Sequence, residues 1–292
     1  MTAPDTDAVL TACNLCGSSR LEPIWSKDGY DLVRCRDCSL VFVANPPGPQ
    51  ALQKLYSFEA GYHSELGSDS WAVQHHQNEA QRNLAVLQRH ARQGRLLDIG
   101  CSTGLFLEFA RGAGFDASGI EYSPDSARVA QAKGLDVAVG ALTDGRYAEQ
   151  SFDLVTLWDV IEHLPDPQAT LAVAARLLKP GGLLVAKTPN CDGWYPRLSL
   201  MVAHQAGYWG HPDPPGHLFQ FSTRTLTDLF TRHGLTPTAT HHGRIPLRYS
   251  FGAPREWLRS PKWAAYCAAF LPIAAVAPWL RAGDDITLVG RR

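Results

Sequence analysis

The stretch RLLDIGCSTG, residues 95–104, decides the fold of this chain. Its apolar run contains one acidic residue, Asp98, and leads into a turn with Gly100 and Gly104. A helix-like segment, TGLFLEFARGAG, follows directly. This order predicts a buried strand, a glycine turn and a helix whose N-terminal amides face a crevice, because open α/β sheets bind ligands where their strands end. The two glycines would let a ligand approach the backbone closely.

Further strands and helices alternate downstream of this stretch. The expected strands are FDASGIE (115–121), LDVAVGAL (135–142), SFDLVTLWDV (151–160) and GGLLVAKTPN (181–190), and the expected helices are SPDSARVAQAKG (123–134), PDPQATLAVAARLL (165–178) and STRTLTDLFTRHG (222–234). Upstream, we expect a helix over about 71–92, which Ser70 can cap. The alternation predicts an α/β fold, a Rossmann-like parallel sheet with helices on both faces.

The composition is that of a globular protein. Of the 292 residues, 45% are hydrophobic and 19% are charged, and 27 basic residues against 28 acidic ones give a net charge of −1. These values exclude a disordered chain and one that binds nucleic acid by bulk charge alone. We expect a small N-terminal module over residues 1–49 and a larger domain over residues 50–292.

Four cysteines form two pairs near the N-terminus, Cys13 with Cys16 and Cys35 with Cys38. Each pair has the C-x2-C spacing, and 18 residues separate the pairs. Two such turns present four thiolates to one tetrahedral Zn²⁺ ion, which leaves no open position and predicts a structural site. The isolated Cys101, Cys191 and Cys267 are expected to pack as small apolar residues.

The charge of this zinc ribbon bears on its partners. Residues 11–50 carry four basic and four acidic side chains, whereas a reader of nucleic-acid backbones should be basic. We therefore expect the ribbon to contact protein or substrate, and we do not expect nucleic acid as its partner. The chain begins without a basic segment followed by an apolar run, which favours a reducing, cytoplasmic compartment.

Residues after the second and third expected strands fit a nucleoside. Glu121 ends the second strand, 23 residues after Asp98, where a carboxylate can accept both hydroxyls of a ribose. Ala141 and Leu142 follow the third strand, where an adenine would lie. LLKPGG, residues 177–182, precedes the fifth strand.

Together these motifs resemble the class I S-adenosylmethionine-dependent methyltransferases. DIGCSTG is similar to their glycine-rich motif, GIEYS to their ribose loop, FDLVTLWDVIEHLPDP to their fourth-strand motif, and LLKPGG to the turn before their fifth strand. The resemblance covers residues 70–190 and implies S-adenosyl-L-methionine as the cofactor. The cofactor-binding residues that it implies are Asp98, Gly100, Cys101, Gly104, Glu121, Tyr122, Ala141, Leu142, Trp158, Asp159 and Tyr62. Ser102 stands where many relatives have glycine.

The ribbon and the segment HLFQFS resemble a subgroup of zinc-ribbon methyltransferases that modify sugars, surface glycans and other specialised small molecules. The resemblance implies O-methylation of a small molecule, a sugar or a glycan precursor. An N- or C-methyltransferase of a specialised metabolite is one alternative. A cofactor-binding but inactive partner subunit and a nucleic-acid-binding modifier are alternatives of another class. The sequence does not fix the oligomeric state.

A hydroxyl acceptor needs a general base, and histidine suits neutral pH. His163 lies four residues after Asp159, a helical spacing that would place both on one face. His211 and His217 lie in an insertion over about 191–220, which we expect to fold over the crevice as a lid. Aromatic residues of this insertion are candidates for stacking on a sugar or ring; they are Trp194, Tyr195, Tyr208, Trp209, Phe219 and Phe221.

An apolar helical insertion is expected over about 254–281. Its 18 residues from Trp263 to Leu280 lack a charge, but Pro272 and Pro278 interrupt them. We expect a helical hairpin, either buried or lying on a membrane surface, rather than a membrane span. Residues 241–292 carry eight basic and three acidic side chains. A basic, apolar surface would bind anionic lipid or a lipid-linked substrate at the inner membrane face.

Overall fold

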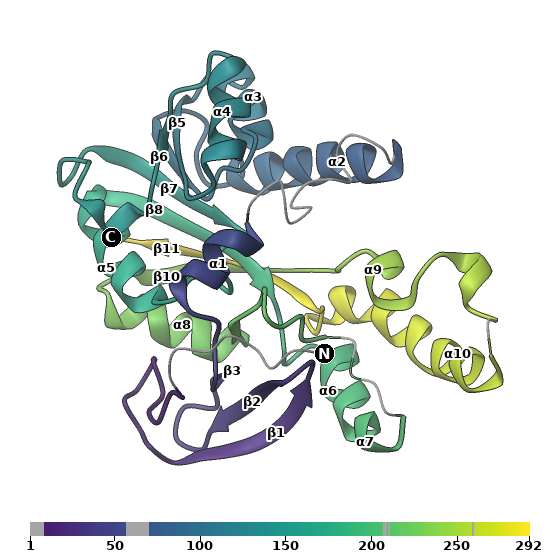
Figure 1. Cartoon of the computed structure of the whole chain (residues 1–292). Coiled ribbons are helices and arrows are strands. Elements are labelled where there is room, and N and C mark those ends of the chain that lie inside the picture. Colours follow the sequence, from purple (N-terminus) through teal and green to yellow (C-terminus); the bar gives the residue numbers. More distant parts are fainter. Residues whose placement is uncertain (1–8, 57–69, 207–208, 210, 259) are drawn as a thin grey trace.

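The computed structural model describes residues 9–56, 70–206, 209, 211–258 and 260–292. A central sheet has seven strands in the order β10-β11-β8-β7-β4-β5-β6. They are β4 (Arg95–Ile99), β5 (Asp116–Glu121), β6 (Val137–Val139), β7 (Phe152–Trp158), β8 (Leu178–Pro189), β10 (Thr236–Gly243) and β11 (Asp285–Arg291). Helices lie on both of its faces (Figure 1).

Alternating residues of the strands pack into two separate hydrophobic cores, one on each face of the sheet. On β4, Leu96 packs with α2 (Ser70–Leu87), α3 (Leu105–Gly112) and α4 (Pro124–Ala132), whereas Leu97 packs on the opposite face. That opposite core includes residues of α5 (Pro167–Leu177) and α8 (Thr223–Arg232). Because side chains alternate along a strand, a strand covered on both sides reads as a continuous apolar run. The predicted α/β fold with helices on both faces is confirmed.

The five strands expected between residues 95 and 190 are parallel, as predicted, and two later strands add an antiparallel edge to the sheet. β8, β7, β4, β5 and β6 are parallel, but β11 pairs antiparallel with β8 and β10 pairs antiparallel with β11. α9 (Leu247–Phe251) and α10 (Pro261–Val276) lie between β10 and β11 in the chain, and β11 then returns beside β8 in the antiparallel direction. The third expected strand is also shorter, because a 3₁₀ turn, Leu142–Asp144, ends it early.

The N-terminal module forms a second, four-stranded sheet with the order β1-β2-β3-β9. Its strands are β1 (Leu21–Lys27), β2 (Tyr30–Cys35), β3 (Val41–Val43) and β9 (Phe219–Gln220). β9 lies within the HLFQFS segment, so the larger domain contributes one strand to the ribbon sheet. Phe42 and Phe219 pair across β3 and β9 and belong to the same hydrophobic core as Leu97. The ribbon is therefore packed into the main core rather than held by a linker alone.

The apolar insertion is one helix and a 3₁₀ turn, not the expected hairpin. α10 spans Pro261–Val276 and continues through Pro272, and a 3₁₀ turn at Ala277–Leu280 places Pro278 in its first turn, where no hydrogen bond is lost. α10 packs on α6 (Trp194–Met201) and α9 (Leu247–Phe251), and this group extends from one end of the central sheet (Figure 1). The remaining short elements are the helices α1 (Pro49–Leu55) and α7 (Ala203–Ala206) and a 3₁₀ turn at Pro254–Glu256.

Candidate active site

A cavity of about 1260 Å³ opens at the carboxyl ends of β4, β5, β7 and β8. Ligand pockets in proteins usually measure about 300–1000 Å³, so this one has room for two molecules side by side. Its wall combines the strand ends with residues of α2 and of the segment 211–217. Tyr195, His211 and His217, from the insertion over 191–220, line the cavity, and the role of this insertion as a lid stays a prediction.

The glycine turn has two structural reasons for its glycines. Gly100 and Gly104 adopt φ values of +70° and +81°, a region that favours glycine. An added Cβ would lie 2.6 Å from Val160 Cγ2 at the first position and 2.2 Å from Leu135 Cδ1 at the second. Backbone conformation and packing therefore require both glycines, and close approach of a ligand remains a prediction.

Asp98 is buried at the floor of the cavity, at the end of β4. Its Oδ1 accepts a hydrogen bond from Thr156 Oγ1 at 2.6 Å. Burial outweighs this bond and raises the pKa of Asp98 to about 8, with the nearby Glu121 carboxylate as a further cause. A carboxylate that is short of donors in this way is suited to a cationic or hydrogen-bond-donating ligand group.

Glu121 is held at the end of β5 by backbone amides. Its Oε2 accepts from the Ser102 N–H at 2.8 Å and its Oε1 from the Ser123 N–H at 2.7 Å. Burial raises the pKa of Glu121 although these bonds act in the opposite direction. Ala141 and Leu142 line the same cavity. The residues expected around a nucleoside are therefore gathered at one end of it.

The remaining cofactor candidates differ in position. Tyr122 lines the cavity and is about half-exposed. Cys101 also lines the cavity but is buried, and it packs so closely on Gly119 that a Cβ added there would lie 2.5 Å from the Cys101 Sγ. Trp158 lines the cavity and packs against Phe106, with 5.1 Å between ring centroids. Its buried Nε1 has no hydrogen-bond partner among the described residues. Tyr62 lies outside the described residues.

Asp159 and His163 do not share a helix face, contrary to the spacing argument. Residues 159–166 form turns and bends, and Asp159 takes a left-handed φ of 54° directly after β7. This conformation directs its carboxylate to Lys187 Nζ, at 2.7 Å. His163 instead has its Nδ1 2.9 Å from the Gly216 carbonyl oxygen. Both residues nevertheless line the cavity.

A buried ion cluster surrounds Lys187, which sequence reasoning missed. Lys187 Nζ contacts Asp159 Oδ2 at 2.7 Å and Asp285 Oδ2 at 3.5 Å, and it donates a hydrogen bond to Glu79 Oε1. These carboxylates raise the pKa of Lys187 although burial opposes them. Glu79 also contacts His75 Nε2 at 3.0 Å. The sequence did contain a signal for this cluster, namely a lysine inside the apolar run GGLLVAKTP. A lysine in a buried strand needs acidic partners, because buried charges are almost always paired.

A second polar group lies beside the segment 211–217. Glu162 is 1% exposed, and its Oε2 accepts from Thr188 Oγ1 at 2.9 Å. His163 and His217 meet edge to face, with ring centroids 4.8 Å apart. Burial lowers the pKa of both histidines and lowers that of His211 to about 4, so their neutral forms are favoured. Glu162 was not among the residues expected from the sequence to act in the site.

The stacking role expected for the aromatic insertion is wrong for most of its members. Tyr195, Trp209, Phe219 and Phe221 are buried in hydrophobic cores, while Trp194 is about half-exposed. Of the members that the structure describes, only Tyr195 lines the cavity, and its hydroxyl lies 3.3 Å from that of Tyr266. Tyr208 lies outside the described residues. Aromatic density in this segment reflects packing of α6 and β9 rather than a binding platform.

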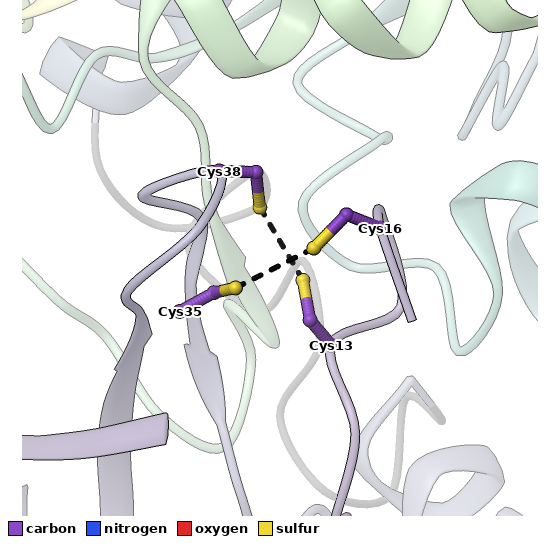
Figure 2. A group of neighbouring side chains, drawn as sticks. All are labelled: Cys13, Cys16, Cys35 and Cys38. Carbon is purple, nitrogen blue, oxygen red and sulfur yellow. Dashed lines mark hydrogen bonds between the residues drawn. The ribbon is translucent and has the colours of Figure 1, made fainter. Parts of the chain in front are cut away.

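The four paired cysteines meet at one point of the ribbon (Figure 2). Their Sγ atoms lie within 4.8 Å of one another, and the Cys13–Cys38 and Cys16–Cys35 pairs are each 3.5 Å apart. Four thiolates bound tetrahedrally to zinc at 2.3 Å would be separated by about 3.8 Å. The donor set and its spacing therefore fit one Zn²⁺ ion.

Comparison with known proteins identifies the family. Residues 73–240, more than half of the 292-residue chain, match the family described as "Methyltransferase domain". The chain belongs to this family and contains a class I S-adenosylmethionine-dependent methyltransferase domain.

Solved structures agree on the fold. A methyltransferase in complex with the Haloferax volcanii Trm112 methyltransferase activator superposes with a TM-score of 0.54, at 18% identity over 76% of this chain and 94% of that one. A SAM-dependent methyltransferase from Archaeoglobus fulgidus gives 0.52, at 17% identity over 74% of this chain and 94% of that one.

Curated relatives match a shorter stretch. The ubiquinone biosynthesis O-methyltransferase of Xanthomonas oryzae pv. oryzae is 40% identical over 103 residues, which are 33% of this chain and 43% of that protein. The protein with this name from Thiobacillus denitrificans is 36% identical over 103 residues, with shares of 33% and 44%. The chain thus spans less than half the length of these curated relatives.

Proposed function

We propose that the chain transfers the methyl group of S-adenosyl-L-methionine to a hydroxyl oxygen of a small molecule, with sugars and glycan precursors among the candidate acceptors. One observation carries this proposal. A single cavity joins the acidic and glycine-rich strand ends to the histidines of the segment 211–217. The relatives named as O-methyltransferases support oxygen over nitrogen or carbon as the acceptor atom.

We assign cofactor binding to one end of the cavity and acceptor binding to the other. Asp98, Glu121 and the Gly100 turn would hold the cofactor, and the bound sulfonium would supply the methyl group for an in-line displacement. The chain's main contribution is alignment of the acceptor, which is worth several kcal/mol in well-oriented reactions. His217, His163 and His211 lie at the other end, where they orient the acceptor or remove its proton.

Two measurements test this function. Isothermal titration calorimetry should detect S-adenosylhomocysteine binding, and transfer of labelled methyl from S-adenosylmethionine to a panel of hydroxyl and amine compounds should identify O-methyl products by mass spectrometry. His217→Ala should lower turnover with saturating acceptor and leave cofactor affinity unchanged. Full turnover in His217→Ala would remove its role. Absence of cofactor binding by the wild-type chain would remove the proposed function itself.

The ribbon is proposed to bind one structural Zn²⁺ ion through its four cysteines. The converging Sγ atoms in Figure 2 support this. Its position also supports a role at the substrate end of the cavity, because Lys27 of β1 lines the cavity and donates to the Pro212 carbonyl at 3.2 Å. These features favour the zinc-ribbon subgroup of methyltransferases.

We propose that the protein is cytoplasmic and contacts the inner face of the membrane through α10 and the turn that follows it. Among the described residues, only Pro261–Leu280 is long and apolar enough to cross a membrane. Trp279 is 88% and Leu258 82% exposed, and Lys262 and Arg281 lie exposed beside them. Liposome flotation with and without anionic phosphatidylglycerol tests this, with Trp279→Ser expected to weaken binding. Equal recovery without lipid would refute it.

A further inference from the structure

Three buried polar atoms near the lid end of the cavity have no hydrogen-bond partner among the described residues. They are Glu162 Oε1, His217 Nδ1 and His211 Nε2. Leaving such an atom unpaired in a buried position costs about 1–3 kcal/mol, and more for a charged group. Glu162 is 1% exposed, so its free oxygen points to a ligand that completes the group.

The neighbouring hydrogen bonds fix which atoms are available. His163 Nδ1 lies 2.9 Å from the Gly216 carbonyl oxygen, which only accepts, so Nδ1 carries the proton. Nε2 of His163 then offers a lone pair, and it lies 4.0 Å from Glu162 Oε1. A histidine whose other nitrogen donates to a backbone carbonyl has the arrangement that commonly orients metal ligands. Glu162 is oriented in the same manner through Thr188.

The third member, His217, is tied to the other two by the backbone. The N–H groups of Leu218 and Phe219 donate to the Glu162 carbonyl at 2.8 and 3.0 Å. One donor atom each from Glu162, His163 and His217 lies within 4.8 Å of the others. Ligands bound at about 2.1 Å are about 3.4 Å apart in a tetrahedral site. A contraction of about 1.4 Å or less would therefore bring the three onto one ion.

We propose that Glu162, His163 and His217 bind one divalent transition-metal ion, distinct from the ribbon zinc. Two imidazoles and one carboxylate suit Zn²⁺, Mn²⁺ or Fe²⁺, and three protein ligands leave coordination positions open. Those positions face the cavity that all three residues line.

The ion gives the site a role in the proposed methyl transfer, on which this part of the inference rests. An acceptor hydroxyl bound to the ion has a lowered pKa and releases its proton to solvent. The oxygen then forms the new C–O bond as the methyl–sulfur bond breaks and the thioether leaves. The acceptor class is a compound with a hydroxyl that binds a divalent cation. This assigns His163 and His217 to positioning through the ion rather than to direct proton removal.

The test measures ion binding independently of activity. The zinc-loaded chain is dialysed against Mn²⁺ and bound Mn²⁺ is counted by elemental mass spectrometry, with S-adenosylhomocysteine affinity measured on the same samples. We expect about one Mn²⁺ per wild-type chain. Glu162→Gln keeps the side-chain shape and should weaken Mn²⁺ binding at least tenfold with cofactor affinity unchanged. His233→Gln, a change at the end of α8 away from the cavity, serves as the matched control and should bind Mn²⁺ normally.

A second readout needs no variant. In the wild-type chain, paramagnetic Mn²⁺ should broaden the imidazole proton signals of His163 and His217 and spare those of His90 and His241, which pair with each other elsewhere. The inference is overturned if the wild-type chain binds S-adenosylhomocysteine but no ion beyond the ribbon zinc at 1 mM Mn²⁺ or Zn²⁺. It is equally overturned if Glu162→Gln binds Mn²⁺ as tightly as wild type. Loss of S-adenosylhomocysteine binding with the ion retained would instead count against the proposed function.

Discussion

Replacing Lys187 by methionine should strongly destabilise the chain. Lys187 is 6% exposed, and its Nζ lies 2.7 Å from Asp159 and 3.5 Å from Asp285, with Glu79 also in contact. At an effective dielectric constant of about 20, each contact at these distances is attractive by about 5–6 kcal/mol before desolvation is counted. Methionine has nearly the same length but leaves three carboxylates facing one another.

The net effect is smaller than the sum of these attractions, because the charges also lose hydration. Removing one partner of a buried ion pair typically destabilises a protein by about 3–5 kcal/mol, and we expect Lys187→Met to fall in this range. Urea unfolding followed by circular dichroism measures it. The surface pair of Lys179 with Asp153, at 2.8 Å with both side chains about 40% exposed, gives the control. Lys179→Met should cost less than about 1 kcal/mol.

The pH dependence of this loss provides a second check. Burial raises the pKa of Asp285 to about 7. Without the lysine, the carboxylates of the cluster relieve their repulsion by taking up protons, and this becomes easier as the pH falls. The destabilisation should therefore be largest at pH 8 and smaller at pH 5. A loss below about 1 kcal/mol at pH 8, similar to that of the surface control, would refute the argument that this cluster is a tightly coupled buried network.

Three further predictions follow from other parts of the chain. Cys38→Ser should lose the ribbon ion, which elemental analysis would show as one zinc fewer per chain than in wild type. It should also lower the melting temperature, because the ribbon core is continuous with the main core; Cys267→Ser, on α10, should keep the wild-type zinc content. Glu121→Gln should weaken S-adenosylhomocysteine binding about 10- to 100-fold in calorimetry, which corresponds to the loss of a charge-assisted hydrogen bond. The control is Glu108→Gln, in an exposed pair with Lys133, which should bind S-adenosylhomocysteine normally. Equal affinities of the two variants would remove the proposed ribose role of Glu121. The pKa of Asp98 is raised to about 8 in the native state, against an ordinary value of 3.8. Between these two pH values the native state therefore binds one more proton than the unfolded state. The free energy of unfolding consequently falls as the pH rises, by at most about 1.4 kcal/mol per pH unit. Asp98→Asn should therefore gain stability relative to wild type from pH 5 to pH 8, and a constant difference would contradict the assigned burial.

The sequence by itself determined those features that depend on short-range order. Apolar runs and glycine turns between residues 95 and 190 located the parallel strands, because burial on both faces makes such strands uniformly apolar. The C-x2-C spacing brought each cysteine pair together within one turn. The acidic ends of β4 and β5 could also be located, since parallel strands end at the same edge.

Only the tertiary structure decided contacts between residues far apart in the chain. Lys187 and Glu79 are 108 residues apart, and no local pattern links them. β9 joins the ribbon sheet, and β11 returns antiparallel beside β8, because hydrogen-bonding edges were open at those places. The same holds for Glu162 and His217, which are brought together where residues 218 and 219 hydrogen-bond to the Glu162 carbonyl. Periodicity reports which face of an element is buried, whereas the partner on that face is set by the packing of the whole chain.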